Sequence, residues 1–308
     1  MPEPRASAGI SPLAVVTGAS SGIGEAVARL LARRGMRTVL IARSAEPLRR
    51  LAKELASFAP SAAFPLDLAD VDAIETAAAE IVSAHGNALV LINNAGYNDF
   101  KPFLSLSPAE HERLLDVNYV APARLLRALL PGMLDQARAG ATPHVINVSS
   151  MSSKVGPWGH AAYAAAKSAL NTLTHALDTE YSPAGVRFSV AYPGLVRTPF
   201  FDRGEYPRLL DKFRRDSISP EQAARAIVGL LDHPRLDLCI PGHYRLLDVL
   251  RAFAPTWTHR TVSRKSRLDA TPHETSPPAY QAPASDDRVV FTRLPARGPQ
   301  TSRADRER

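Results

Sequence analysis

The amino-acid sequence predicts an α/β protein with a doubly wound, Rossmann-like parallel sheet of seven strands flanked by helices. Three observations support this fold class. A strand, a glycine-rich turn and a helix open the chain, strand-like and helix-like segments then alternate seven times, and residues 88–92 are apolar throughout, as in a strand buried on both faces. Because no linker interrupts the alternation, we expect a single domain.

The expected domain covers residues 13–258. Residues 1–12 are expected to form a flexible N-terminus without the apolar core of a secretory signal, and residues 259–308 a disordered, basic tail rich in Pro and Ser. From Arg251 onward, 11 Lys and Arg stand against 6 Asp and Glu, which gives +5 of the formal charge of +7. Because the charge concentrates there, we expect no nucleic-acid partner. The tail is either a solvated appendage or makes weak peripheral contact with an anionic membrane surface.

The remaining composition excludes several classes of site. The single cysteine, Cys239, rules out an internal disulfide framework and a thiolate metal cluster. The nine histidines show no ligand spacing, so most are expected at the surface and no metal is expected. No segment approaches 18 consecutive apolar residues, so we expect no membrane span and favour a cytoplasmic protein.

The first unit of the chain has the form of a nucleotide-binding turn. Residues 13–16 predict a strand and residues 25–34 a helix, and Thr17-Gly-Ala-Ser-Ser-Gly-Ile-Gly24 joins them. Glycines let the backbone turn tightly and approach a pyrophosphate, whose charge is met by the positive end of the following helix. The candidate cofactor-binding residues of this turn are Gly18, Ser20, Ser21, Gly22, Ile23 and Gly24.

The second strand, residues 36–42, ends in Arg43-Ser44. In dinucleotide folds an acidic residue at this point binds the ribose 2′-hydroxyl, whereas an arginine suits a 2′-phosphate. No acid is present here, so we expect NADP(H), with Arg43 as the phosphate partner and Ser44 beside it. NAD(H) stays an alternative, because an exposed arginine at a helix start has the same sequence.

Two further strands place candidate residues beside the cofactor. After a helix at residues 47–58, the strand at residues 62–66 is followed by Asp67-Leu68, where Asp67 either caps the next helix, residues 71–85, or binds an adenine amino group. Residues 88–92 are followed by Asn93-Asn94-Ala95-Gly96, small residues against which a flat cofactor can lie. The candidates here are Asp67, Leu68, Asn94, Ala95 and Gly96.

The second half of the chain continues the alternation. Ser107 and Pro108 start a long helical stretch that contains Asn118, an amide that is either buried with a partner or functional. Three more strands are expected at residues 145–148, 187–192 and 237–240, the first ending at Ser149-Ser150 and the second at Pro193-Gly194. A helix capped by Ser219 is expected to run to Leu231.

Residues 160–179 contain no Gly or Pro and predict a helix on which Tyr163 and Lys167 share one face. A nearby cation favours the phenolate and lowers the pKa of a tyrosine by roughly one to three units. The spacing by itself is also typical of a solvated stripe. Its meaning therefore depends on the rest of the chain.

Taken together, these residues resemble the short-chain dehydrogenase/reductase family, in its single-domain branch, from residue 13 to about residue 242. The resemblance implies that Tyr163 is the general acid/base, that Lys167 binds the nicotinamide ribose and lowers the pKa of the tyrosine, and that Ser150 orients the substrate oxygen. It implies that Asn118 links the lysine to a proton-relay water and that Asn94 stabilises the sheet beside the cofactor. Further implied cofactor contacts follow the strand at residues 187–192: Pro193, Gly194, Val196 and Thr198.

The predicted function is an NADP(H)-dependent oxidoreductase that transfers hydride between the nicotinamide and a carbonyl or secondary alcohol of a small to medium apolar molecule. The alternatives are a non-catalytic NADP(H)-sensing binding protein, an NAD-preferring dehydrogenase of the same fold, and a membrane-associated scaffold. Family resemblance also implies a homodimer or homotetramer. Residues 199–217 are expected to cover the substrate, and residues 245–260 to form one amphipathic helix that packs on the body, a second subunit or a membrane.

Overall fold

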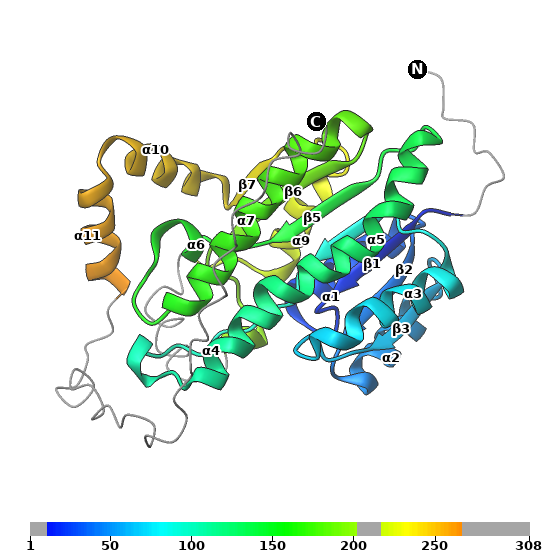
Figure 1. The fold of residues 1–308 in the computed structure, drawn as a ribbon, viewed down its shortest axis with the longest axis horizontal. Helices are drawn as coiled ribbons and strands as arrows, with labels where there is room; N and C mark the ends of the chain where they lie inside the picture. The colour runs from blue at the N-terminus through cyan, green and yellow to red at the C-terminus, as the bar shows by residue number, and fades with distance from the viewer. Residues whose placement is uncertain (1–10, 202–216, 267–308) are drawn as a thin grey trace, which may run out of the picture.

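The computed structural model describes residues 11–201 and 217–266. Its sheet has the strand order β3-β2-β1-β4-β5-β6-β7, and every strand pair is parallel, which confirms the predicted fold class (Figure 1). The strands are β1 (Leu13–Thr17), β2 (Arg37–Ala42), β3 (Ser61–Pro65), β4 (Val90–Asn93), β5 (His144–Val148), β6 (Arg187–Pro193) and β7 (Asp237–Ile240).

Helices cover both faces of this sheet. One apolar core forms against α1 (Gly22–Arg33), α2 (Ala45–Leu55) and α9 (Pro220–Gly229), and the other against α3 (Ile74–His85), α5 (Ala121–Arg138) and α7 (Ala161–Tyr181). Successive strand residues enter opposite cores, because side chains of a strand alternate between faces. Val16 and Ile92 lie in the first core and Val15 and Leu91 in the second.

Shorter helices connect these layers. Two helices start at capping boxes: Ser107 accepts from the backbone amide of Glu110 before α4, and Ser219 does the same for Gln222 before α9. The short helices are η1 (Val71–Ala73), η2 (Phe103–Ser105), α4 (Pro108–Leu115), η3 (Asp116–Val120), α6 (Ser152–Val155), η4 (Ser182–Ala184), η5 (Pro199–Phe201) and η7 (Gly242–Tyr244).

The strand order fixes where a ligand can enter. From β1 the chain moves outward through β2 to β3, and it then returns to the other side of β1 as β4. The helices that follow β1 and β4 therefore lie on opposite faces, which leaves a crevice at the carboxyl ends of these two strands. The motifs predicted to bind a cofactor follow these strand ends.

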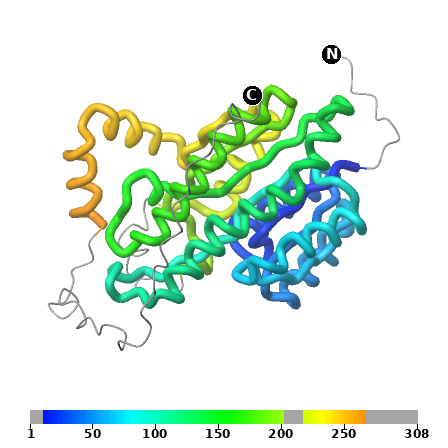
Figure 2. The backbone as a smooth tube through the Cα atoms, viewed as in Figure 1, coloured from blue at the N-terminus to red at the C-terminus, as the bar shows by residue number. Residues whose placement is uncertain are grey.

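The C-terminal part differs from the expectation of one amphipathic helix. It forms two helices, α10 (Arg245–Phe253) and α11 (Pro255–Ser266), because Pro255 cannot continue the first one. The expected start of the disordered tail, residue 259, falls inside α11, where Thr258 and Ser266 are buried. Figure 2 follows the chain from β7 through both helices at one end of the molecule.

Several expectations concern residues that lie outside the described ranges. These are the N-terminus up to residue 10, the tail from residue 267, and most of the expected substrate-covering segment, residues 202–216. The residues on either side of that last segment are described, and they contact one another. Val196 pairs with Ile218, and Arg197 Nη1 donates to the carbonyl oxygen of Ser217 at 2.7 Å. Within the described residues, none of the helices combines the length and apolar character required to cross a membrane.

A buried ladder of polar side chains fixes α7 to the sheet. Asn93 of β4 donates to Asn147 of β5 at 2.8 Å, and Asn147 donates to the hydroxyl of Thr174 of α7 at 2.8 Å. All three side chains are buried, so each bond avoids the cost of an unsatisfied polar group. Since α7 also carries Tyr163 and Lys167, this ladder helps to set their position relative to β5.

Thr174→Val should lower the free energy of unfolding by about 1–3 kcal/mol, because it leaves the amide of Asn147 buried without its acceptor. Thr172→Val is the matched control: its hydroxyl also bonds the carbonyl four residues earlier, but at an exposed position, and the expected change is within about 0.5 kcal/mol. Urea unfolding followed by circular dichroism measures both. Equal losses in the two variants would contradict the structural role of the ladder.

Candidate active site

A cavity of about 590 Å³ lies at the carboxyl ends of the strands and extends from the end of β2 to α7, α10 and α11. Nearly all of the residues expected to bind a cofactor or to act in catalysis line it. The expected residues in its wall are Gly18, Ser20, Ser21, Gly22, Ile23, Arg43, Ser44, Asp67, Leu68, Asn94, Ala95, Gly96, Ser150, Tyr163, Lys167, Pro193, Gly194, Val196 and Thr198. The structure places Gly24 and Asn118 behind this wall.

The turn after β1 leaves no room for side chains at its three glycines. Gly18 has a φ of +65°, and a Cβ at Gly24 would lie 2.2 Å from the carbonyl oxygen of Gly18. A Cβ at Gly22 would lie 2.9 Å from Cγ2 of Thr198, so the loop after β6 packs directly on this turn. The turn therefore brings the backbone itself to the cavity, immediately before the N-terminus of α1, where an anion is favoured.

Thr17 and Asn94 hold this turn against the end of β4. The hydroxyl of Thr17 accepts from the backbone amides of Asn94 at 2.9 Å and of Ala95 at 3.0 Å. The Asn94 side chain donates to the carbonyl oxygens of Thr17 at 3.0 Å and of Gly18 at 3.3 Å. Both strand ends are thus fixed relative to each other across the crevice. The bonds of Asn94 agree with the sheet-stabilising part of its implied role.

The far end of the cavity carries charge. Arg43 and Ser44 are exposed at the end of β2. The carboxylate of Asp67 accepts from the backbone amide of Ala69 at 3.0 Å and from Arg113 at 3.2 Å. Asp67 therefore caps the turn before η1, and the expectation that it caps the helix itself is wrong, because two residues of turn intervene.

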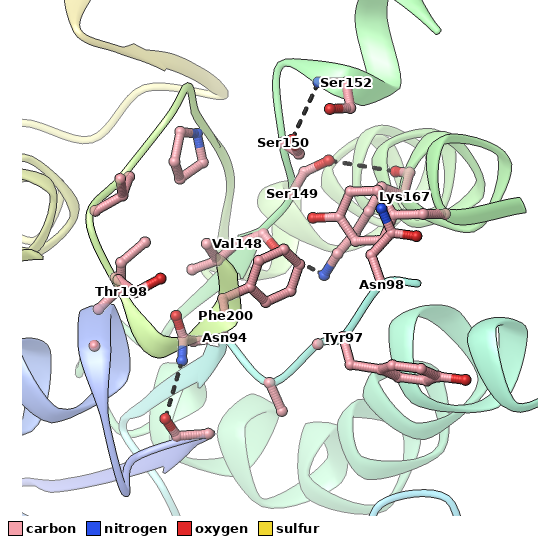
Figure 3. A pocket seen from close by; sticks show the side chains of 18 of the residues that line it. Asn94, Tyr97, Asn98, Val148, Ser149, Ser150, Ser152, Lys167, Thr198 and Phe200 are labelled. Atoms are coloured by element: carbon pink, nitrogen blue, oxygen red, sulfur yellow. Dashed lines mark hydrogen bonds between the residues drawn. The ribbon is translucent and has the colours of Figure 1, made fainter. Parts of the chain in front are cut away.

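Tyr163, Ser150 and Lys167 meet where β5 ends beside α7. Ser150 and Tyr163 both line the cavity at this point, and Nζ of Lys167 donates to the carbonyl oxygen of Val148 at 3.0 Å (Figure 3). Nζ lies 6.0 Å from the centroid of the Tyr163 ring. The two side chains are 7% and 2% exposed, so neither belongs to a solvated stripe.

Burial controls the protonation of this pair. It raises the pKa of Tyr163 to about 12, although interaction with the Ser150 hydroxyl lowers this pKa in part. It lowers the pKa of Lys167 to about 8. The expected lowering of the tyrosine pKa by the lysine is therefore wrong for the protein alone, because a buried phenolate loses more hydration than the neighbouring groups replace.

Asn118 lies within the expected helical stretch, in its π-helical turn η3 between α4 and α5. Its amide nitrogen donates to the carbonyl oxygens of Tyr97 and Leu114, both at 2.9 Å, whereas its buried Oδ1 has no hydrogen-bond partner among the described residues. A Cβ at Gly96 would lie 2.7 Å from this Oδ1 and 3.3 Å from Nζ of Lys167. An orphaned acceptor and the ammonium group thus converge beside Gly96.

Three aromatic rings line the cavity near Tyr163, those of His160, Phe200 and Phe201. The ring of Phe200 lies 6.0 Å from that of Tyr163, and Phe200 packs edge-on against Phe201. Phe100 packs against Trp158 and His160, both at 5.2 Å. Burial lowers the pKa of His160 to about 4, so this ring is neutral near pH 7. The wall is therefore apolar and uncharged.

Helix α11 closes the same end of the cavity. Val262 and Ser266 belong to its lining, and the hydroxyl of Ser266 accepts from the backbone amide of Trp158 at 3.2 Å. This bond joins α11 to the loop that precedes Tyr163. A segment that the sequence assigned to the tail is thus part of the candidate active site.

A comparison with known families agrees with this geometry. The family described as short chain dehydrogenase matches residues 12–205, well over half of the chain. The chain belongs to the short-chain dehydrogenase family. The resemblance stated from the motifs is thereby confirmed, and the protein is an oxidoreductase of the class that acts on CH–OH or C=O groups with a nicotinamide dinucleotide.

Known relatives extend the match beyond the motifs. Dehydrogenase/reductase SDR family member 7B from Bos taurus is 34% identical over 269 residues, which cover 83% of this chain and 81% of that protein. A metagenomic short-chain oxidoreductase in complex with NADP is 36% identical with a TM-score of 0.62, over 75% of this chain and 97% of that one. A short-chain dehydrogenase from Sphingobium yanoikuyae in complex with NADPH is 27% identical with a TM-score of 0.69, over 84% and 98%.

Several cavity residues of this short-chain dehydrogenase were not predicted. Arg113 and His160 are single polar residues on segments whose periodicity gives no sign that they face a cavity. Val262 and Ser266 lie beyond the expected end of the domain. One available signal was the absence of helix-breaking residues from 256 to 266, which is compatible with a helix that continues past residue 258.

Val262→Phe should narrow the end of the cavity and raise KM for bulky ketones by roughly tenfold or more relative to small ones. The matched control is His259→Phe, an exposed position on the same helix, which should leave the preference unchanged. Steady-state kinetics on ketones of graded size measure both. If Val262→Phe retained the size preference of the unmodified enzyme, α11 would have no part in substrate selection.

Proposed function

We propose that this protein is an NADP(H)-dependent oxidoreductase that interconverts a carbonyl group and a secondary alcohol on a small to medium apolar substrate, with Tyr163 as the general acid/base. The observation that carries this proposal is the convergence of Ser150, Tyr163 and Lys167 in the wall of one cavity. A phenol, a hydroxyl and an ammonium group in one wall form a proton-transfer site.

The cavity fits a dinucleotide. Gly18, Gly22 and Gly24 leave no room for a Cβ and so keep the backbone of this turn close to the cavity, and the turn leads into the N-terminus of α1, which favours phosphate. At the other end, Lys167 lines the cavity and offers a donor, and the buried Oδ1 of Asn118 lies behind the wall beside Gly96. A bound nicotinamide supplies or accepts the hydride.

The chain's own residues handle the proton. Because its pKa is about 12, the Tyr163 hydroxyl is protonated near pH 7 and is ready to donate to a substrate oxygen. Ser150, in the same cavity wall, orients that oxygen. Lys167 is mainly charged below about pH 8 and is held by the carbonyl of Val148. The uncharged aromatic wall limits access of water and accommodates an apolar substrate.

The cofactor preference rests on Arg43. It lines the cavity at the end of β2, its side chain is exposed, and no acidic residue occupies that strand end. A guanidinium is complementary to a 2′-phosphate and has no acceptor for a 2′-hydroxyl donor. Structural relatives solved with NADP and NADPH support a nicotinamide dinucleotide in this cavity, and one relative was solved with NADH.

Tyr163→Phe should reduce turnover by about 10²–10⁴-fold, because it removes the positioned proton donor, while leaving the Kd for NADPH almost unchanged. Tyr181→Phe, at the end of the same helix, is the matched control and should keep full activity. A ketone panel followed by NADPH absorbance, together with NADPH fluorescence titration, measures both quantities. Undiminished turnover by Tyr163→Phe would refute the assigned role, and an unmodified protein that binds NADPH without turnover would indicate a sensor.

Arg43→Asp should shift the ratio of kcat/KM for NADPH over NADH by roughly 10- to 100-fold toward NADH, because it replaces a charge-assisted bond by repulsion of the 2′-phosphate. Arg49→Asp introduces the same charge at an exposed position on α2 and should leave the ratio nearly unchanged. Equal use of both cofactors by the unmodified enzyme would show that Arg43 does not select the cofactor.

A further inference from the structure

The two C-terminal helices present an unusual concentration of exposed apolar side chains. We refer to residues 245–266, which form α10 and α11, as the arm. Of the nine large apolar side chains that are exposed in the described residues, five lie in the arm: Leu246, Val249, Leu250, Phe253 and Trp257. Phe253 is 88% exposed and Trp257 59%. The arm extends from β7 at one end of the molecule (Figure 1).

The apolar side chains of α10 form one stripe. Leu246, Val249, Leu250 and Phe253 follow the spacing i, i+3, i+4, i+7, so they lie on a single face of the helix. This is the pattern of a helix that buries one face against a partner. In the described part of the protein, however, this face is directed to solvent.

Unpaired positive charge accompanies the stripe. The arm contains five exposed cationic side chains, and none of them forms an ion pair with a described residue: Arg245, Arg251, Arg260, Arg264 and Lys265. Its single carboxylate, Asp248, is already paired with Lys154 of the body at 2.8 Å. The surface of the arm is therefore both apolar and strongly cationic.

Helix α11 has an inner face that packs on the protein and an outer face that is exposed to solvent. Thr258 and Ser266 are buried, and Ser266 bonds to the backbone of Trp158. Trp257, Arg260 and Arg264, at the spacing i, i+3, i+7, are exposed on the opposite face. An outward tryptophan beside two arginines suits a lipid interface, where the indole occupies the headgroup region and the guanidinium groups meet phosphates.

We propose that the arm docks the protein on an anionic lipid surface. The apolar stripe of α10 and the indole of Trp257 enter the boundary between headgroups and acyl chains, and the five cations contact the lipid phosphates. A second copy of the chain is disfavoured as the occupant, because a two-fold interface would oppose five cations to five others. Docking uses only the outer face of α11, so the inner face keeps its contacts with the cavity and the active site is not disturbed.

The test is flotation of the full chain with vesicles of phosphatidylcholine alone or with about one third phosphatidylglycerol. We expect binding to the anionic vesicles and little to the neutral ones. Arg260→Gln/Arg264→Gln should lower the partition coefficient roughly thirtyfold, since each cation near an anionic surface contributes about fivefold. Phe253→Ser/Trp257→Ser should lower it by about tenfold or more. A chain ending at Ser266 should still bind.

Matched controls separate the arm from general charge and hydrophobicity. Arg49→Gln/Arg50→Gln removes two exposed arginines of α2, and Phe58→Ser removes an exposed aromatic side chain far from the arm in sequence. Both should bind like the unmodified protein, and all variants should keep NADPH turnover in solution. Equal binding by the arm variants and the unmodified protein would overturn the proposal. So would arm variants that convert a dimer to a monomer in sedimentation while vesicle binding is absent throughout.

Discussion

The burial of two ionisable side chains in one cavity wall is the constraint on which the site depends. Tyr163 and Lys167 lie on the same face of α7, and both are removed from water by the packing of that helix against the end of β5. Burial favours the neutral form of each, so the phenol holds its proton and the ammonium group loses its proton more readily than in water. The protonation states of Tyr163 and Lys167 then depend on the charged groups that bind beside them.

The remainder of the fold sets the position of that pair. The Asn93–Asn147–Thr174 ladder connects two central strands to α7, and the bonds between Thr17 and Asn94 fix the glycine turn to the end of β4. The crevice at the β1–β4 switch point and the cluster of Ser150, Tyr163 and Lys167 at the end of β5 consequently share one cavity. A sheet built in this order brings the glycine turn after β1 and the Tyr163 region of α7 to one cavity, although the two are far apart in the sequence.

The fold class and the family could be predicted because their signals are local. The glycine turn, the apolar strands and the Tyr163–Lys167 spacing each fall within a short stretch of sequence. What could not be predicted depends on packing between distant segments. Arg113 meets Asp67, and Ser266 meets the loop before Tyr163, across 46 and 108 residues of chain. The pKa of Tyr163 was mispredicted for the same reason, since spacing does not reveal the depth of burial.

Titration of Tyr163 itself tests this account most directly. In protein labelled with ¹³Cζ-tyrosine, the resonance missing from Tyr163→Phe is followed against pH, with and without NADP⁺. The account predicts an apparent pKa near 12 for the protein alone, and a value lower by about one unit or more with NADP⁺, because the cationic nicotinamide favours the phenolate. A pKa of about 10, the ordinary value for tyrosine, in both states would contradict it.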